Sequence, residues 1–195
     1  MGTVLIPGQG LIFMKVGVHA KESLEEIIAR KKKEIDQAGF ALWGYGGATC
    51  YPNSMVQPFA KECVAKGQKL MLCMQEMDSK HFAEPVRATH CSVDGRTWSE
   101  IHPAINVRGS RFAMAIKSLE TEDFVLPLDH TRVAIGPNKG RVGDTYIRGR
   151  ADKGCFELTS GLISGGPVDS LSKVRISLVA ELCEPYAVFL KNPPQ

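Results

Sequence analysis

The stretch that decides the fold runs from Gly10 to Gly47 and reads GLIFMKVGVHAKESLEEIIARKKKEIDQAGFALWGYGG. It opens with Leu11–Val16, an apolar segment typical of a β-strand. Ser23 follows, with Glu26 three residues later, which is the spacing of a capping box. Gly39 suits the left-handed position that ends a helix. We therefore predict a strand and then a capped helix over residues 24–38.

The predicted helix carries an apolar stripe and a basic run. Leu24, Ile27, Ile28 and Ile35 recur at helical spacing and predict one buried face. The basic run Arg30–Lys33 is interpreted as a solvated face rather than a nucleic-acid patch. Since a stripe this narrow buries one side only, we expect the helix to pack on a sheet.

The rest of the chain predicts mainly strands. A short helix is expected from Pro58 to Gly67, and Asp94-Gly95 indicates a two-residue hairpin turn. The acidic run after Glu120 is interpreted as a loop that lasts through Pro127. Further strands are expected at 40–43, 69–75, 86–93, 111–117, 131–135, 144–150, 173–182 and 186–190.

The regular alternation of strand and helix found in doubly wound folds is absent. We therefore predict an α+β fold, with a curved, mainly antiparallel, barrel-like sheet and one main helix packed against it. Residues 1–195 are expected to form a single domain, because 195 residues suit one core. A C-terminal hairpin appendage over 168–195 could follow the glycine-rich loop 160–167, which could act as a lid.

Composition is that of an ordinary soluble domain with a mild positive charge. The formal net charge of +3 permits an anionic partner without requiring one. The six cysteines form no C-x-x-C pair, so we interpret them as reduced and structural, and we expect neither a metal nor a cofactor. No apolar run approaches about 20 residues, and no signal peptide is visible. The expected location is the cytoplasm, without membrane association.

The first candidate ligand site is Trp43-Gly44-Tyr45-Gly46-Gly47. Trp43 and Tyr45 would point to the same side of a strand and could stack on a planar base. The glycines, Gly46 among them, would let the backbone approach a ligand closely. The alternative is that Trp43 fills the core and the glycines form a bulge.

The second candidate is the glycine-rich basic turn Gly136–Gly143. Its backbone N–H groups, with Lys139 and Arg141, could form an anion nest, and Arg148 would follow on the next strand. Arg108 and Arg111 could add phosphate contacts. The alternative is a solvated hairpin. If both candidates are real, one holds a ring and the other its phosphate, as a nucleotide would require.

No catalytic motif stands out among the histidines. His81, His90 and His130 lack the spacing of a helical metal site or of a paired-histidine phosphodiesterase. If the protein were an enzyme, these three would be the candidates for acid–base chemistry with a carboxylate brought close by the fold.

Four segments of the first ~75 residues carry a family resemblance: Ile12–Val16, the helix from Ser23, Ala41–Trp43 and Lys66–Leu72. Together they resemble the opening of a PUA-like domain of the EVE or ASCH type, with Gln68 where the family more often has Asp. The resemblance implies binding of RNA, modified bases or small nucleotides in a cleft lined by aromatic and polar residues.

The leading hypothesis is a non-enzymatic binding protein for a nucleotide, a modified nucleobase or a short oligonucleotide, RNA or DNA included. The alternative is a hydrolase that acts on a phosphodiester or N-glycosidic bond. A third hypothesis is a structural protein that forms a homodimer through the hairpin at Lys173–Leu190.

Overall fold

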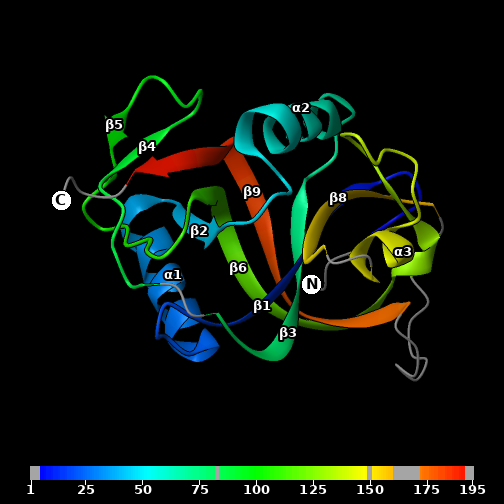
Figure 1. Ribbon diagram of the computed structural model, residues 1–195, viewed down its shortest axis with the longest axis horizontal. Coiled ribbons are helices and arrows are strands. Elements are labelled where there is room, and N and C mark those ends of the chain that lie inside the picture. Colours follow the sequence, from blue (N-terminus) through cyan, green and yellow to red (C-terminus); the bar gives the residue numbers. More distant parts are fainter. Residues whose placement is uncertain (1–4, 82–83, 149–150, 160–171, 192–195) are drawn as a thin grey trace.

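The structure, a computed structural model, describes residues 5–81, 84–148, 151–159 and 172–191 (Figure 1). The expected loop 160–167, with its suggested lid role, lies outside these residues. The described strands are β1 (Gly10–His19), β2 (Ala41–Tyr45), β3 (Met71–His81), β4 (His90–Ser92), β5 (Ser99–Glu100), β6 (Phe112–Pro127), β7 (Thr131–Val133), β8 (Lys153–Leu158) and β9 (Lys173–Lys191). The described helices are α1 (Leu24–Ala38), α2 (Gln57–Ala65), α3 (Gly143–Arg148), the π-helical turn η1 (Pro52–Val56) and the 3-10 turn η2 (Leu128–His130).

The strands form one large mixed sheet in the order β2-β6-β9-β3-β1-β8-β7, with β4 joined to β9 and β5 joined to β4. Strands β1 and β3 pair in parallel, and the other pairs are antiparallel. The expected α+β class is confirmed. The sheet is not closed into a barrel, because its order ends at β2 on one side and at β7 on the other.

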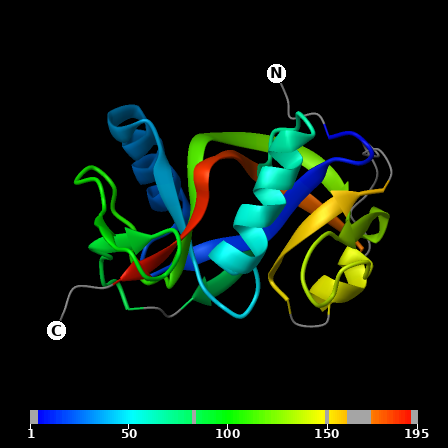
Figure 2. The ribbon, with the colours of Figure 1, turned by 90° about the horizontal axis from the view of Figure 1, so that it is seen from above.

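The expectation of one main helix is not confirmed, since the described part of the chain has three α-helices at separate places around the sheet. α1 is the longest, with 15 residues, while α2 has nine. α1 and α3 lie at opposite ends of the molecule in both views, and α2 lies between them (Figures 1 and 2).

Helix α1 begins and ends where the sequence predicts. The Ser23 hydroxyl accepts a hydrogen bond from the backbone N–H of Glu26, whose carboxylate accepts one from the Ser23 N–H in return. Gly39 takes the left-handed conformation, with φ 84°, and its N–H bonds to the Ile35 carbonyl. Local chemistry alone therefore determines both ends of this helix.

The strands β6 and β9 are far longer than their local patterns indicate. The prediction of a loop after Glu120 is wrong, because β6 continues to Pro127. Val125 and Leu126 are buried there and pair with Arg175 and Val174 of β9. A long pairing partner thus keeps the acidic stretch extended.

The prediction of a C-terminal hairpin is also wrong. β9 is a single strand of 19 residues that runs through the cis peptide Glu184–Pro185. It pairs with β6 on one side and with β3 and then β4 on the other. The segment Lys173–Leu190, through which the third hypothesis would form a homodimer, therefore pairs with strands of its own chain.

Two other expectations are corrected at turns. Residues expected to form a strand at 144–150 form α3, whose carboxylate Asp144 pairs with Arg148 one turn later. The Asp94-Gly95 turn is a longer connection between β4 and β5. The Asp94 carboxylate caps it by accepting from the N–H groups of Thr97 and Arg96, which lower the pKa of Asp94 to about 2.

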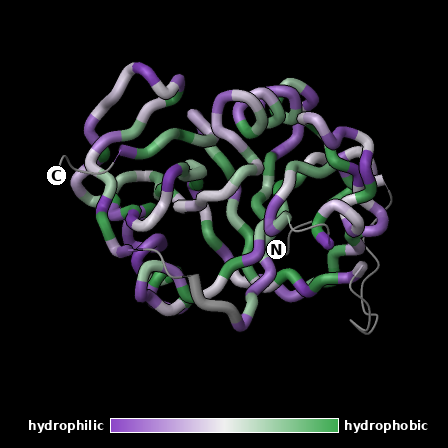
Figure 3. Tube along the Cα trace, viewed as in Figure 1, coloured by the Kyte–Doolittle hydropathy of each residue, from purple (hydrophilic) through white to green (hydrophobic). Residues whose placement is uncertain are grey.

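The apolar residues gather in three clusters around the sheet, and hydrophilic residues occupy much of the outer turns (Figure 3). The largest cluster joins α1, α2 and one face of the sheet and contains Ile12, Ile27, Trp43, Tyr45 and Phe59. In the part of the chain that the structure describes, no helix is long and apolar enough to cross a membrane.

Candidate binding site

A cavity of about 450 Å³ lies beside the largest apolar cluster, where α1, the end of β1, β2, β8 and the segment 107–110 meet. Its volume falls within the range of small-molecule sites, roughly 300–1,000 Å³. Of the sequence-predicted site residues, four line this cavity: Trp43, Tyr45, Gly46 and Arg108. The structure thus brings together residues from two segments that are more than 60 positions apart in the sequence.

Trp43 and Tyr45 lie on the same face of β2, as strand alternation predicts. Both are also core residues, with exposed fractions of 5% and 4%. The alternative interpretation, that Trp43 fills the core, is therefore compatible with a cavity position. A residue of this kind presents one edge or face to the cavity and is held rigidly by packing on its other sides.

The Tyr45 ring is fixed by three neighbours. Its hydroxyl donates to the Cys50 carbonyl oxygen at 2.5 Å, and its ring packs against Phe112 with centroids 5.5 Å apart. The Lys153 ammonium nitrogen lies 6.0 Å from the Tyr45 ring centroid. Burial raises the pKa of the Tyr45 hydroxyl far above its usual range, so this group stays a neutral donor.

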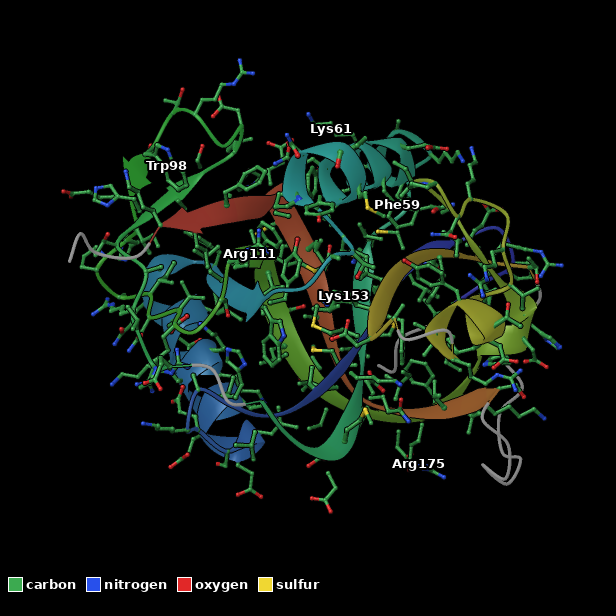
Figure 4. All side chains as sticks on the ribbon, in the orientation of Figure 1. Phe59, Lys61, Trp98, Arg111, Lys153 and Arg175 are labelled. Carbon is green, nitrogen blue, oxygen red and sulfur yellow. The ribbon has the colours of Figure 1, made fainter. Side chains whose placement is uncertain are left out.

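Lys153 is a cavity residue that sequence reasoning missed. It is 3% exposed, and its Nζ atom contacts Oδ1 of Asp152 at 2.6 Å. Figure 4 shows Lys153 toward the middle of the molecule, whereas Arg175 lies at the rim. No strand was predicted at 153–158. The alternation of Lys153 and Cys155 with Gly154 and Phe156 is a sequence signal that could have indicated a strand. In the structure, the pairing Met14↔Lys153 directs the lysine toward the cluster around Trp43.

Arg108 reaches the cavity as part of an ion-pair network. Glu22 contacts Arg108 at 2.7 Å and Arg30 of α1 at 2.5 Å. Burial by itself raises the pKa of the Glu22 carboxyl, but hydrogen bonds from the two guanidinium groups outweigh this and hold the pKa below its ordinary value. Glu22 therefore stays ionised and connects α1 to the segment that carries Arg108.

The basic run of α1 is only partly a solvated face, which corrects the sequence interpretation. Arg30 and Lys31 line the cavity, whereas Lys32 and Lys33 are exposed. Lys31 is 2% exposed and contacts Glu34 at 3.0 Å and the Asn106 carbonyl oxygen at 3.0 Å. The segment around Asn106 covers this side of the helix, a contact that helical periodicity cannot reveal.

The cavity has an excess of positive charge. Among the residues that the structure describes, five cationic residues line it, together with one carboxylate, Asp152; the cations are Lys15, Arg30, Lys31, Arg108 and Lys153. Glu22 and Glu34 are not lining residues, but they pair with three of these cations. When their two negative charges are counted as well, a formal excess of two positive charges is left. In a partly desolvated site this excess favours an anionic ligand.

His19 and Ser110 both line the cavity and contact each other, so together they form one wall of it. The Nε2 atom of His19 lies 3.2 Å from the Ser110 hydroxyl oxygen and 3.2 Å from the Arg108 carbonyl oxygen. Ala20 and Lys21, which follow His19, both take left-handed conformations, with φ 49° and 67°. Strained non-glycine residues of this kind tend to cluster at functional sites.

Gly44 permits this wall to approach β2. A Cβ atom at Gly44 would lie 2.3 Å from the Ser110 hydroxyl oxygen and 3.0 Å from Val107. A Cβ at Gly46 would meet nothing within 4 Å. The glycines of the aromatic stretch therefore differ in role: close packing requires Gly44, whereas the space beside Gly46 has room for a side chain.

The other cationic residues predicted for the site lie elsewhere. The Arg111 guanidinium stacks on the Phe112 ring, 5.1 Å from its centroid. Lys139 lines a second, smaller cavity of about 210 Å³ with Lys66 and Arg132. Arg141 donates to the Thr145 carbonyl and Arg148 pairs with Asp144. The basic turn is therefore not part of the cavity that Trp43 and Tyr45 line.

The three histidines considered for catalysis occupy separate elements. The His90 ring contacts the Thr89 hydroxyl at 2.8 Å, and His130 lies in η2 with its Nε2 3.8 Å from Asp129. Neither lines the large cavity. His81 is a backbone partner of His19 in the β1–β3 ladder. Within the described residues, no group of three or more His, Cys, Asp or Glu side chains could hold a metal ion.

Comparison with protein-family models, with curated proteins and with solved structures gave no match for this chain.

Proposed function

We propose that this protein is a binding protein for a nucleotide, a modified nucleobase or a short oligonucleotide, and that the large cavity is its site. The observation that carries the proposal is the meeting of Trp43 and Tyr45 with Arg108 and Lys153 around one space of about 450 Å³. A planar ring would lie against the aromatic side of the cavity. An anionic group would lie toward Lys153.

Lys153 is the sharpest place to test the anionic contact. Its partner Asp152 is largely exposed, with a side-chain exposed fraction of 64%, so this carboxylate can turn to solvent when a ligand anion takes its place. A charge-assisted contact of this kind contributes about 1.5–3 kcal/mol, or roughly tenfold or more in affinity. Lys153→Met should therefore weaken AMP binding at least tenfold and change adenosine binding little.

The matched control is Lys117→Met. Lys117 also pairs with a carboxylate, Glu181 at 3.0 Å, but it does not line the cavity. The experiment is a thermal-shift and calorimetry series with AMP, GMP, CMP, UMP and the free nucleosides, alongside mass spectrometry of any small molecule that co-purifies. A ligand at 100 times its dissociation constant adds about 2.7 kcal/mol of stability. Equal AMP affinity in Lys153→Met and Lys117→Met would remove Lys153 from the site.

Trp43 tests the stacking contact. Because the residue is buried, Trp43→Phe is preferred to alanine, since it keeps an aromatic ring in the core. Stacking contributes about 1–3 kcal/mol for each base, so the smaller ring should reduce nucleoside affinity measurably while the protein stays folded. Unchanged affinity for both adenosine and AMP would refute the stacking contact.

A second candidate function, hydrolysis of a bound nucleotide, is favoured by the position of the His19 imidazole and the Ser110 hydroxyl at the cavity wall. The Arg108 carbonyl can only accept, so Nε2 donates to it when that bond forms and cannot then take a proton from Ser110. Binding without turnover therefore fits the hydrogen bonds better. Recovery of AMP as adenosine and phosphate, abolished by His19→Gln, would favour the hydrolase instead.

A further inference from the structure

Two free thiols lie in contact next to Tyr45, a residue that lines the cavity. The Sγ atoms of Cys50 and Cys155 are 3.9 Å apart, although the residues are 105 positions apart in the sequence. Both residues are buried, with exposed fractions of 0% and 1%. They come from different elements, since Cys155 lies in β8 and Cys50 lies in the connection between β2 and η1.

The two cysteines differ in how firmly they are held. Cys155 pairs with Ile12 of β1, and its carbonyl accepts from the Ala134 N–H on the other side, so its strand is fixed at both edges. Cys50 lies outside any helix or strand and has φ 59°, a left-handed conformation that is unusual for a residue with a side chain. If the sulfurs move together, Cys50 is the residue that moves.

Cys50 is also connected to the cavity wall. Its carbonyl oxygen accepts the hydrogen bond from the Tyr45 hydroxyl, and Tyr45 lines the cavity. Gly46 and Gly47, which precede it by a few residues, also line the cavity. Any displacement of Cys50 therefore acts on the Tyr45 hydroxyl and on the backbone of Gly46 and Gly47.

We propose that Cys50 and Cys155 form a redox-sensitive pair that hydrogen peroxide converts to a disulfide, and that this disulfide weakens ligand binding in the adjacent cavity. The second part rests on the proposed function, whereas disulfide formation does not. Joining the sulfurs brings them from 3.9 Å to the roughly 2.05 Å of an S–S bond. That closure displaces the Cys50 carbonyl from the Tyr45 hydroxyl.

The chemistry balances with peroxide as the oxidant. Cys50 first loses its thiol proton, and the thiolate attacks one oxygen of hydrogen peroxide. The O–O bond breaks, a sulfenic acid forms on Cys50, and the hydroxide that leaves combines with the released proton to form water. The Cys155 sulfur then attacks the Cys50 sulfur, the S–O bond breaks, and a second water leaves with the Cys155 proton. Two thiols lose two electrons in total, and one peroxide is reduced to two waters.

The geometry assigns the two roles. Hydrogen bonding with Cys50, together with burial, raises the pKa of the Cys155 thiol well above its ordinary value, so Cys155 keeps its proton and acts second. Cys50 is the residue nearer to the exposed segment at Gly47 and Ala48. Peroxide is close in size to water, which suits a buried sulfur better than a bulky disulfide reagent would.

The test is peroxide treatment of the reduced protein, followed by denaturation, alkylation and peptide mapping. The expected result is a peptide pair that joins Cys50 to Cys155, with a loss of two hydrogen masses that dithiothreitol reverses. Cys91→Ser and Cys183→Ser are the controls, because these half-buried thiols are more accessible but have no thiol partner among the described contacts. Oxidation confined to Cys91 and Cys183, or a link from Cys63 to Cys155, would overturn the assignment.

The second readout is AMP affinity by calorimetry before and after oxidation. Loss of the Tyr45 hydrogen bond should weaken AMP binding about fivefold, with recovery on reduction. The Cys50→Ser protein should bind AMP normally, and its AMP affinity should not change after peroxide treatment. A disulfide at full yield with unchanged AMP affinity would refute control of the cavity. If the reduced protein does not bind AMP at all, the proposed function fails at that ligand, while the peptide map still decides the disulfide.

Discussion

The Nζ atom of Lys31 lies 3.0 Å from Oε2 of Glu34, and both side chains are 2% exposed. Burial is the main cause that lowers the pKa of Lys31, to about 8, although the Glu34 carboxylate opposes it. The pair joins α1 to the segment 105–108 through the Asn106 carbonyl and N–H groups. A lysine held in this way makes the stability of the fold depend on pH in the alkaline range.

The first prediction concerns that pH dependence. Because an unfolded lysine keeps a pKa near 10.5, the unfolded chain binds more protons than the native state between pH 8 and pH 10.5, and Lys31 makes stability rise with pH there. The stability difference between wild type and Lys31→Met should shift in favour of wild type by about 3 kcal/mol over this range. Urea denaturation at pH 7, 8, 9 and 10 measures it. A constant offset between the two curves would contradict the prediction.

The second prediction concerns the carboxylate. Glu34→Gln leaves the Lys31 ammonium buried with a neutral partner, which should cost about 3–5 kcal/mol at pH 7 and less at pH 10. Glu62→Gln is the matched control, because its i,i+4 pair with Lys66 is exposed and should have no measurable effect. Equal denaturation midpoints for the two variants at pH 7 would show that burial does not strengthen the Lys31–Glu34 pair.

The third prediction separates two neighbouring glycines. Gly44→Ala places a Cβ atom 2.3 Å from the Ser110 hydroxyl oxygen, so it should destabilise the fold by about 1–3 kcal/mol or displace the segment that carries Ser110. Gly46→Ala meets nothing within 4 Å and should leave stability unchanged or slightly higher. Thermal unfolding of both variants tests this, and a stable Gly44→Ala protein with unchanged AMP binding would argue against close packing there.

The fourth prediction concerns the start of α1. Ser23→Ala removes the hydroxyl that accepts from the Glu26 N–H and should cost about 1 kcal/mol. Ser54→Ala, at an exposed serine in η1, is the control and should be close to neutral. Ser23→Asp should restore most of the loss, because a carboxylate also caps a helix. Failure of aspartate to rescue would mean that the cap does not limit stability.

Features that depend on neighbouring residues were predictable from sequence. The ends of α1 follow from Ser23, Glu26 and Gly39, and α2 follows from Pro58 and Gly67. The shared face of Trp43 and Tyr45 follows from strand alternation. In each case the interacting groups are at most a few residues apart, so the local pattern contains the whole interaction.

Features that depend on distant partners were not predictable. β6 extends through its acidic stretch because β9 pairs with it. β9 continues past Pro185, with a shift of register against β6 there, because β6 and β4 hold both of its edges beyond that point. Residues 144–150 were predicted to form a strand, but α3 forms there instead. Their apolar pattern is so short that it fits the helical period as well as the strand period.

The candidate site divides in the same way. The sequence by itself determined that Trp43 and Tyr45 would share one face of a strand, because every second side chain on a strand points to the same face, and that Gly46 follows them directly. Only the tertiary structure decided that Arg108 and Lys153 join them while Lys139 and Arg141 do not, and that Lys31 is buried. The physical reason is that charge and burial at a cavity depend on which chain segments pack there, and that choice is made by long-range strand pairing and not by local periodicity.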